Sequence, residues 1–296
     1  LSNNNYLGSG MFAKFSKVEL ANINVADAKV IGGDDNDYIN SIEQTADGGY
    51  IVGGCFYSSS LDLGNGVVLN NKGNNDGMII KYNKEGKVEW TKVIGESGYD
   101  YISSIKQTAD GGYIAGGYFK SSSIDLGNGV TLKDDDSSGN GMIIKYNKEG
   151  EAEWANAIDG NSINSISLAT ETADGGYIVG GYFRSSSIDL GNGVTLIKNS
   201  KNTSVENAML IKYSAKGEAE WAQTIGGNDN DSINSVEQTA DGGYIVGGNF
   251  KSSSIDLGSG ITLNKTFDKI CGMLIKYNQE GEIEWAKEIG ANDRSY

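Results

Sequence analysis

The segment TADGGYIVGG and its close variants recur four times and constrain the fold more than any other feature of this sequence. Successive copies begin 63, 64 and 67 residues apart, and the four tryptophans Trp90, Trp154, Trp221 and Trp285 follow a similar spacing. A period of this length indicates one supersecondary unit per repeat, with hydrophobic faces that are buried only when neighbouring units stack. The copies occupy residues 45–54, 108–117, 172–181 and 239–248.

Each repeat predicts short β-strands joined by tight turns. Its apolar runs are too short for helices, are rich in Ile, Val, Tyr and Thr, and are separated by Asp-Gly and Asn-Gly. We expect Asp47-Gly48 to form a two-residue type I′ hairpin turn and Asn65-Gly66 to form a second, smaller hairpin in the same way. Residues 83–86 (NKEG) fit a type I turn followed by a left-handed glycine, which creates a bulge.

The NKEG turn predicts a register for the two strands it joins. Lys81 then faces Glu89, an ion pair that recurs as Lys145/Glu153, Lys212/Glu220 and Lys276/Glu284. Such a cross-strand pair contributes roughly 0.2–1 kcal/mol. The same register places four side chains on one packed face: Ile80, Tyr82, Val88 and Trp90.

The strand pattern predicts a β-propeller built from four-stranded blades of about 64 residues, each with an extra small hairpin. Bulky apolar residues fall on both faces of YIVGGCF (50–56), so each sheet must pack between two neighbours. A linear β-solenoid would also bury both faces, but its coils are normally shorter than this period. In a propeller, the paired glycines would allow close approach near the crowded centre.

The repeats divide the whole chain, 1–296, into one propeller domain or segment. Residues 10–30 match the second half of a blade, because GMFAKF resembles GMIIKY of the next repeat. The two ends do not complement each other, so we expect a segment of a longer protein whose complete ring has five or more blades. The divisions are 10–30 (half-blade), 31–94, 95–157, 158–224 and 225–288 (repeats), and 289–296 (start of a further repeat).

Each unit resembles the bacterial β-propeller repeats called SBBP repeats. The resemblance lies in Ile31-Gly-Gly, TADGGYIVGG, KYNKEG and Glu89-Trp90, and it covers almost the whole chain. The blades are also kelch-like in the Gly-Gly that ends a strand and in their Tyr…Trp hairpin. The resemblance implies a secreted or cell-surface bacterial protein. It carries no shared catalytic residue.

The amino-acid composition limits the classes of partner that this chain is expected to bind. The 24 basic and 39 acidic residues give a net charge of −15, which disfavours nucleic acid and anionic lipid and leaves cations and basic proteins open. No apolar run approaches the roughly 18 residues of a membrane span, and LSNNN has neither part of a signal peptide, so we expect no direct membrane insertion. Cys55 and Cys271 do not recur between repeats and are interpreted as structural thiols.

The sequence does not favour an enzyme. Histidine is absent, which removes the commonest bases and metal ligands. A carbohydrate-active hydrolase or lyase needs only two carboxylates and stays an alternative. The recurrent acids have structural explanations, however: Asp47 and its equivalents lie in turns, and Glu89 and its equivalents lie in ion pairs. No cofactor is expected.

Two loops supply hard oxygen ligands for calcium, DDND at 34–37 and NDND at 228–231. The corresponding loops, ESGYD at 96–100 and the shortened DGNS at 159–162, do not keep the same ligand positions, which favours solvated turns. The candidate ligands are Asp34, Asp35, Asp37, Asp229 and Asp231.

The repeated SSSIDLG segments could form one ligand site per blade, as in propeller lectins. The alternative is hairpin scaffolding, in which Asp62, Asp125, Asp189 and Asp256 accept backbone amides. Repeats differ most in the stretches 70–76, 133–140, 197–207 and 264–271, where a rigid scaffold would display specificity. DDD at 134–136 is expected to be an exposed acidic tip. The candidate ligand-binding residues are Asn74, Asp76, Asp134, Asp135, Asp136, Asn202, Asn207, Lys265, Phe267 and Asp268.

The leading interpretation is a non-catalytic extracellular or cell-surface β-propeller. It binds a protein or glycan partner, or displays a surface to one, through its variable blade loops, as in adhesion. The hydrolase or lyase is one alternative. A structural spacer of a large surface protein is another.

Overall fold

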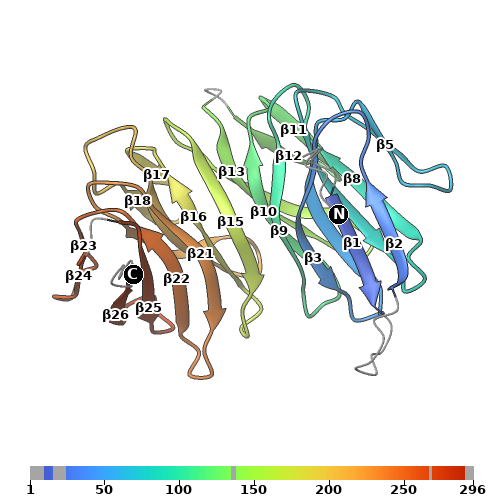
Figure 1. The fold of residues 1–296 in the computed structure, drawn as a ribbon. Coiled ribbons are helices and arrows are strands. Elements are labelled where there is room, and N and C mark those ends of the chain that lie inside the picture. The colour runs from blue at the N-terminus through green and yellow to red at the C-terminus, as the bar shows by residue number, and fades with distance from the viewer. Residues whose placement is uncertain (1–9, 16–24, 135–137, 267–268, 291–296) are drawn as a thin grey trace, which may run out of the picture.

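The computed structural model describes residues 10–15, 25–134, 138–266 and 269–290, and every helix or strand assigned in these ranges is a β-strand. Four sheets each contain four antiparallel strands, one sheet per repeat, and a two-stranded sheet precedes them. Figure 1 shows the sheets side by side in chain order, from the blue N-terminal end to the red C-terminal end. The all-β expectation with four-stranded repeats is confirmed.

Strands follow the same order in every repeat, with neighbours along the chain hydrogen-bonded and a small hairpin inserted before the third long strand. The N-terminal sheet pairs β1 (Gly10–Phe15) with β2 (Val25–Ile31). The four-stranded sheets are β3 (Asp37–Gln44), β4 (Tyr50–Phe56), β7 (Asp76–Tyr82), β8 (Val88–Ile94); β9 (Tyr101–Gln107), β10 (Tyr113–Phe119), β13 (Asn140–Tyr146), β14 (Ala152–Ile158); β15 (Asn164–Glu171), β16 (Tyr177–Phe183), β19 (Asn207–Tyr213), β20 (Ala219–Ile225); β21 (Asp231–Gln238), β22 (Tyr244–Phe250), β25 (Cys271–Tyr277), β26 (Ile283–Ile289). The small hairpins are β5 (Ser60–Asp62) with β6 (Val68–Asn70), β11 (Ser123–Gly127) with β12 (Val130–Lys133), β17 (Ser187–Asp189) with β18 (Thr195–Ile197), and β23 (Ser254–Asp256) with β24 (Thr262–Asn264).

The turn inside TADGGY differs from the predicted type I′ turn. Only Gly48 has a positive φ, 81°, and its amide donates to the carbonyl of Thr45 (2.8 Å). The result is a type I turn followed by a left-handed glycine. The prediction is wrong because the Asp47 side chain accepts from the Thr45 hydroxyl and the Gly49 amide, which holds Asp47 at negative φ. In the smaller hairpin, Asn65 (φ 55°) and Gly66 (φ 81°) confirm a type I′ turn.

A lysine links the repeated turn to the next hairpin. Lys81 is 2% exposed, and its Nζ lies 2.8 Å from Asp47 and 2.8 Å from Glu89. The hydrogen bond from Lys81 lowers the pKa of Asp47 to about 2, so this carboxylate stays charged near neutral pH. Equivalent pairs of salt bridges occur at Lys145, Lys212 and Lys276. The predicted Lys–Glu pairing is confirmed in all four repeats.

The register around this ion pair is shifted by a bulge. Lys81 pairs with Trp90, and Tyr82 pairs with Val88, so Glu89 is the extra residue. Trp90 therefore turns to the face opposite Tyr82 and Val88 and packs against the second sheet. The predicted face shared by Ile80, Tyr82, Val88 and Trp90 is wrong for Trp90, because an extra residue reverses the side of every later side chain.

Both faces of the middle strands are buried, as expected. Every residue of β7 is buried, and so is all of β4 except Tyr50. Strands β4, β10 and β16 contact the first strand of the following sheet, β9, β15 and β21. A Cβ on Gly53 would stand 2.8 Å from Ile102 of the second sheet, so the first glycine of the pair permits close packing of sheets.

Candidate functional site

The serine-rich segments belong mainly to the framework. Ser58 is fully buried and donates to Asp37 at 2.6 Å, and the pairs Ser121–Asp100 and Ser252–Asp231 repeat this distance. In these three repeats the bond ties the segment before the small hairpin to the start of the first long strand of the same sheet, and in the third repeat the Ser185 hydroxyl donates to the Ser162 carbonyl instead. The buried serine is committed to the fold and is not available to a ligand.

The aspartates of the small hairpins act as predicted. Asp62 accepts the Gly64 amide at 2.8 Å, and Asp125, Asp189 and Asp256 accept the equivalent amides at 2.9, 2.9 and 3.0 Å. The scaffolding interpretation is therefore confirmed for these four carboxylates.

The calcium candidates direct their oxygens toward their own chain. Asp34 accepts the amide and hydroxyl of Ser59, and Asp35 accepts the Asn36 amide. Asp37 and Asp231 are 1% exposed, so these loops are not wholly solvated turns, and Asp229 bonds the Asn230 amide. In the described ranges, no three acidic or Cys residues gather as a metal site.

Several predicted ligand-binding residues lie inside the molecule. Asp76, Asn207 and Asp134 are 0%, 0% and 3% exposed. Asp134 accepts from the Gly139 amide and from Asn140, so the expected exposed tip is wrong for this residue. Buried polar groups need internal partners, and short loops close over them.

Other predicted residues remain at the surface. Asn74 and Asn202 are exposed, and Lys265 is half-buried and donates to the Lys251 carbonyl. Asp135, Asp136, Phe267 and Asp268 lie outside the described residues.

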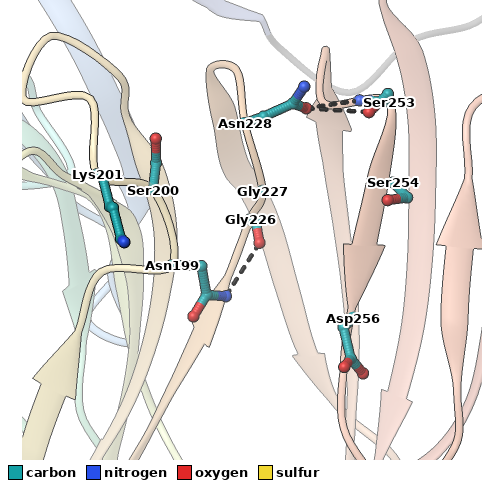
Figure 2. A pocket seen from close by; sticks show the side chains of 9 residues that line it. All are labelled: Asn199, Ser200, Lys201, Gly226, Gly227, Asn228, Ser253, Ser254 and Asp256. Carbon is teal, nitrogen blue, oxygen red and sulfur yellow. Dashed lines mark hydrogen bonds between the residues drawn. The ribbon is translucent and has the colours of Figure 1, made fainter.

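The longest variable loop, residues 198–206 between β18 and β19, borders a polar cavity of about 490 Å³. Figure 2 shows Ser200 and Lys201 of this loop across the opening from Asn228, Ser253 and Ser254, which belong to the fourth repeat. Asn199 donates to the Gly226 carbonyl at 3.0 Å, and Asn228 accepts from both the amide and the hydroxyl of Ser253. The walls are thus held by hydrogen bonds. The lining is Asn199, Ser200, Lys201, Gly226, Gly227, Asn228, Ser253, Ser254 and Asp256.

The corresponding loop of the first repeat closes against the second repeat. Lys72 forms a salt bridge with Glu96 (2.7 Å), and the Asn74 amide donates to the Gly98 carbonyl. A Cβ on Gly73 would lie only 2.2 Å from the Glu96 carbonyl oxygen, so little space is left there. In the third repeat the loop is longer, and a cavity lies between it and the fourth repeat.

A second cavity of about 300 Å³ lies on the other side of the same loop and shares Ser200 and Lys201 with the first. Its lining includes three cations and no carboxylate, on a chain with a net charge of −15. We call it the basic pocket, and its lining is Asn161, Ser162, Arg184, Ser186, Lys198, Ser200, Lys201 and Thr203.

The cations of the basic pocket are held differently. Arg184 forms a 2.6 Å salt bridge with Glu206, and Lys198 donates to the Asn202 carbonyl at 2.7 Å. Burial, and then the nearby Arg184 charge, lower the pKa of Lys198. Lys201 has no hydrogen-bond or ion-pair partner within the described part of the chain, so its charge is available to a ligand.

Sequence reasoning identified the loop but not these residues. The sequence predicted Asn202 and Asn207 as ligand-binding residues within the variable stretch 197–207. The greater length of this loop than of its equivalents is the sequence signal that indicates the cavity. The partners from 226–228 and 253–256 come from the next repeat, and only packing brings them near.

No family model and no curated protein matches this chain. Among solved structures, it is similar to a suggested 6-phosphogluconolactonase of Bacteroides fragilis at 9% identity and a TM-score of 0.37, over 99% of this chain and 85% of the other. It is also similar to Sqt1 of Chaetomium thermophilum at 9% identity and a TM-score of 0.29, over 83% and 82% of the two chains. At these scores the likeness does not extend either protein's activity to this chain.

The described segments include no helix long and apolar enough to cross a membrane.

Proposed function

We propose that this chain is a non-catalytic binding protein that takes a glycan in the polar cavity between its third and fourth repeats. The observation that carries the proposal is the cavity's lining of amides, hydroxyls and backbone groups, with one lysine and one aspartate, on walls fixed by hydrogen bonds. Its volume of about 490 Å³ lies within the roughly 300–1,000 Å³ typical of small-ligand sites. Sugar hydroxyls are matched by groups of this kind.

Three further parts of the proposal come from the sequence. The repeats are SBBP-like blades, the complete ring is a closed β-propeller, and the protein acts outside the cell or at its surface in adhesion or display. A rigid stack of sheets with variable loops along its rim supports a binding role. Asp47, Glu89 and their equivalents support it as well, because these carboxylates are engaged in turns and ion pairs.

The test is a glycan array probed with the folded chain, followed by calorimetry on any hit. Ser254→Tyr would place a large side chain in the cavity and should abolish binding without loss of stability, because Ser254 is exposed. Ser123→Tyr changes the equivalent exposed residue of the second repeat and should leave binding intact. Absence of any glycan hit, together with capture of a defined protein ligand by the same surface, would replace the glycan with a protein partner.

A further inference from the structure

The basic pocket extends the proposed site toward negatively charged ligands. On a chain of charge −15, most surface hollows should repel an anion. Here Arg184, Lys198 and Lys201 converge without a carboxylate in the lining, and Glu206 offsets only one of the three charges through Arg184. The local balance is therefore opposite to that of the whole chain.

Hydrogen-bond donors complete this pocket. The hydroxyls of Ser162 and Thr203 and the amide of Asn161 line it beside the cations. The Ser162 amide donates to the Ser185 hydroxyl, and the Ser204 amide, next to Thr203, donates to the Asn202 side chain. Cations flanked by hydroxyl and amide donors can bind a carboxylate or sulfate group through charge-assisted hydrogen bonds.

The basic pocket lies within the third repeat, and its pair of cations at positions 184 and 198 recurs in the fourth repeat, as Lys251 and Lys265, but in neither of the first two. Position 184 is occupied by Tyr57 in the first repeat and Lys120 in the second, and position 198 is Asn71 and Asp134 there. Asp134 places a buried carboxylate where Lys198 contributes a cation. The first two repeats therefore lack this concentration of positive charge.

We propose that the basic pocket binds the anionic substituent, a carboxylate or sulfate, of a glycan whose neutral part occupies the adjoining polar cavity. The inference rests on the proposed function, because one ligand must cross the loop at Ser200 and Lys201, which line both cavities. Lys201 then acts as the specificity residue between the two.

The test compares uronic-acid oligosaccharides and sulfated oligosaccharides with their neutral counterparts by calorimetry, with sodium sulfate and sodium phosphate as separate probes. Acidic glycans should bind about tenfold or more tightly than neutral ones, and added salt should weaken the difference. Lys201→Gln should remove about tenfold of the affinity for the acidic glycan. It should weaken binding of the neutral glycan by a clearly smaller factor, because Lys201 also borders the polar cavity. Lys201→Arg should retain the preference.

The matched control is Lys216→Gln, which removes the same charge from an exposed turn of the third repeat. It should leave both affinities unchanged. Equal binding of acidic and neutral glycans, or loss of affinity with Lys216→Gln as large as with Lys201→Gln, would overturn this inference and leave the proposed function standing. Inorganic sulfate that binds as tightly as a sulfated glycan would overturn the assignment to a glycan. Failure of neutral and acidic glycans alike would overturn the proposed function itself.

Discussion

Two buried carboxylates meet between the first and second sheets. Asp76 Oδ1 and Asp100 Oδ2 lie 2.4 and 2.7 Å from the point where a Gly95 Cβ would stand, and Asp76 Oδ1 has no hydrogen-bond partner among the described residues. Burial raises the pKa of Asp76 to about 6 and also raises that of Asp100. The next two repeats have Asn140 and Asn207 at the position of Asp76, which are close in shape to a protonated aspartate.

The first prediction concerns the pH dependence of stability. An unfolded aspartate has a pKa of about 3.9, so the folded protein binds this proton more tightly. The stabilisation is complete below pH 4 and is lost as pH rises through about 6, by about 1–3 kcal/mol. Asp76→Asn should reduce the fall of the unfolding free energy between pH 4.5 and 7.5, measured by urea denaturation. Part of the slope remains, because burial also raises the pKa of Asp100 and of Asp231. Asp62→Asn, at an exposed hairpin, should keep the wild-type slope, and an unchanged slope in Asp76→Asn would contradict the prediction.

At the scale of the element, the last strand of each of the first three four-stranded sheets carries a tryptophan that packs against the following sheet. Trp90, Trp154 and Trp221 lie edge-on to Tyr113, Tyr177 and Tyr244, with centroid distances of 5.4, 5.5 and 5.6 Å. Each also covers a turn glycine of the following repeat, as Trp154 covers Gly217. Trp285 on β26 is 38% exposed. The equivalent tryptophans are therefore expected to contribute different amounts to the free energy of unfolding.

The prediction for this element compares two identical substitutions. Trp154→Ala should lower the unfolding free energy by about 2–3 kcal/mol, because it removes the contact with Tyr177 and leaves a void over Gly217. Trp285→Ala should cost less than about 1 kcal/mol, since this side chain is partly exposed already. Denaturant unfolding of both variants measures the difference. Equal losses would mean that the tryptophan acts within its own sheet.

At the scale of the whole molecule, the distance between stacked sheets depends on the first glycine of each Gly-Gly pair. A Cβ on Gly116 would lie 2.5 Å from Ile166 and 3.3 Å from Ala169 of the third sheet. At Gly247 of the fourth sheet, the nearest atom would be the Ser235 Cβ at 3.8 Å. The requirement for glycine is therefore set by the neighbouring sheet and not by the local backbone.

The contrast between Gly116 and Gly247 predicts how an added methyl group at each position changes the stability of the stacked sheets. Gly116→Ala should lower the unfolding free energy by about 1–3 kcal/mol, because Ile166 is fully buried and must shift. Gly247→Ala should change it by less than about 1 kcal/mol and could raise it by restricting the unfolded chain. Thermal unfolding of the two variants tests this. A similar loss at both sites would show that the glycine serves strand pairing and not sheet packing.

The sequence by itself determined the number of repeats, the strands, the small type I′ hairpins and the recurrent Lys–Glu pairs. These features depend on interactions within a repeat, where Asn-Gly turns and alternating residues leave few conformations. Even there, the Asp47 side chain changed one turn type, and one bulge at Glu89 moved Trp90 to the other face.

Only the tertiary structure decided which polar residues are buried and where a cavity opens. Asp76, Asp134 and Asn207 resemble exposed loop residues in the sequence, but their loops fold inward. The polar cavity combines residues 199–201 with partners from 226–228 and 253–256, across the junction of two repeats. No local pattern encodes this arrangement, because the length of one loop and the packing of the next sheet together determine the space between them.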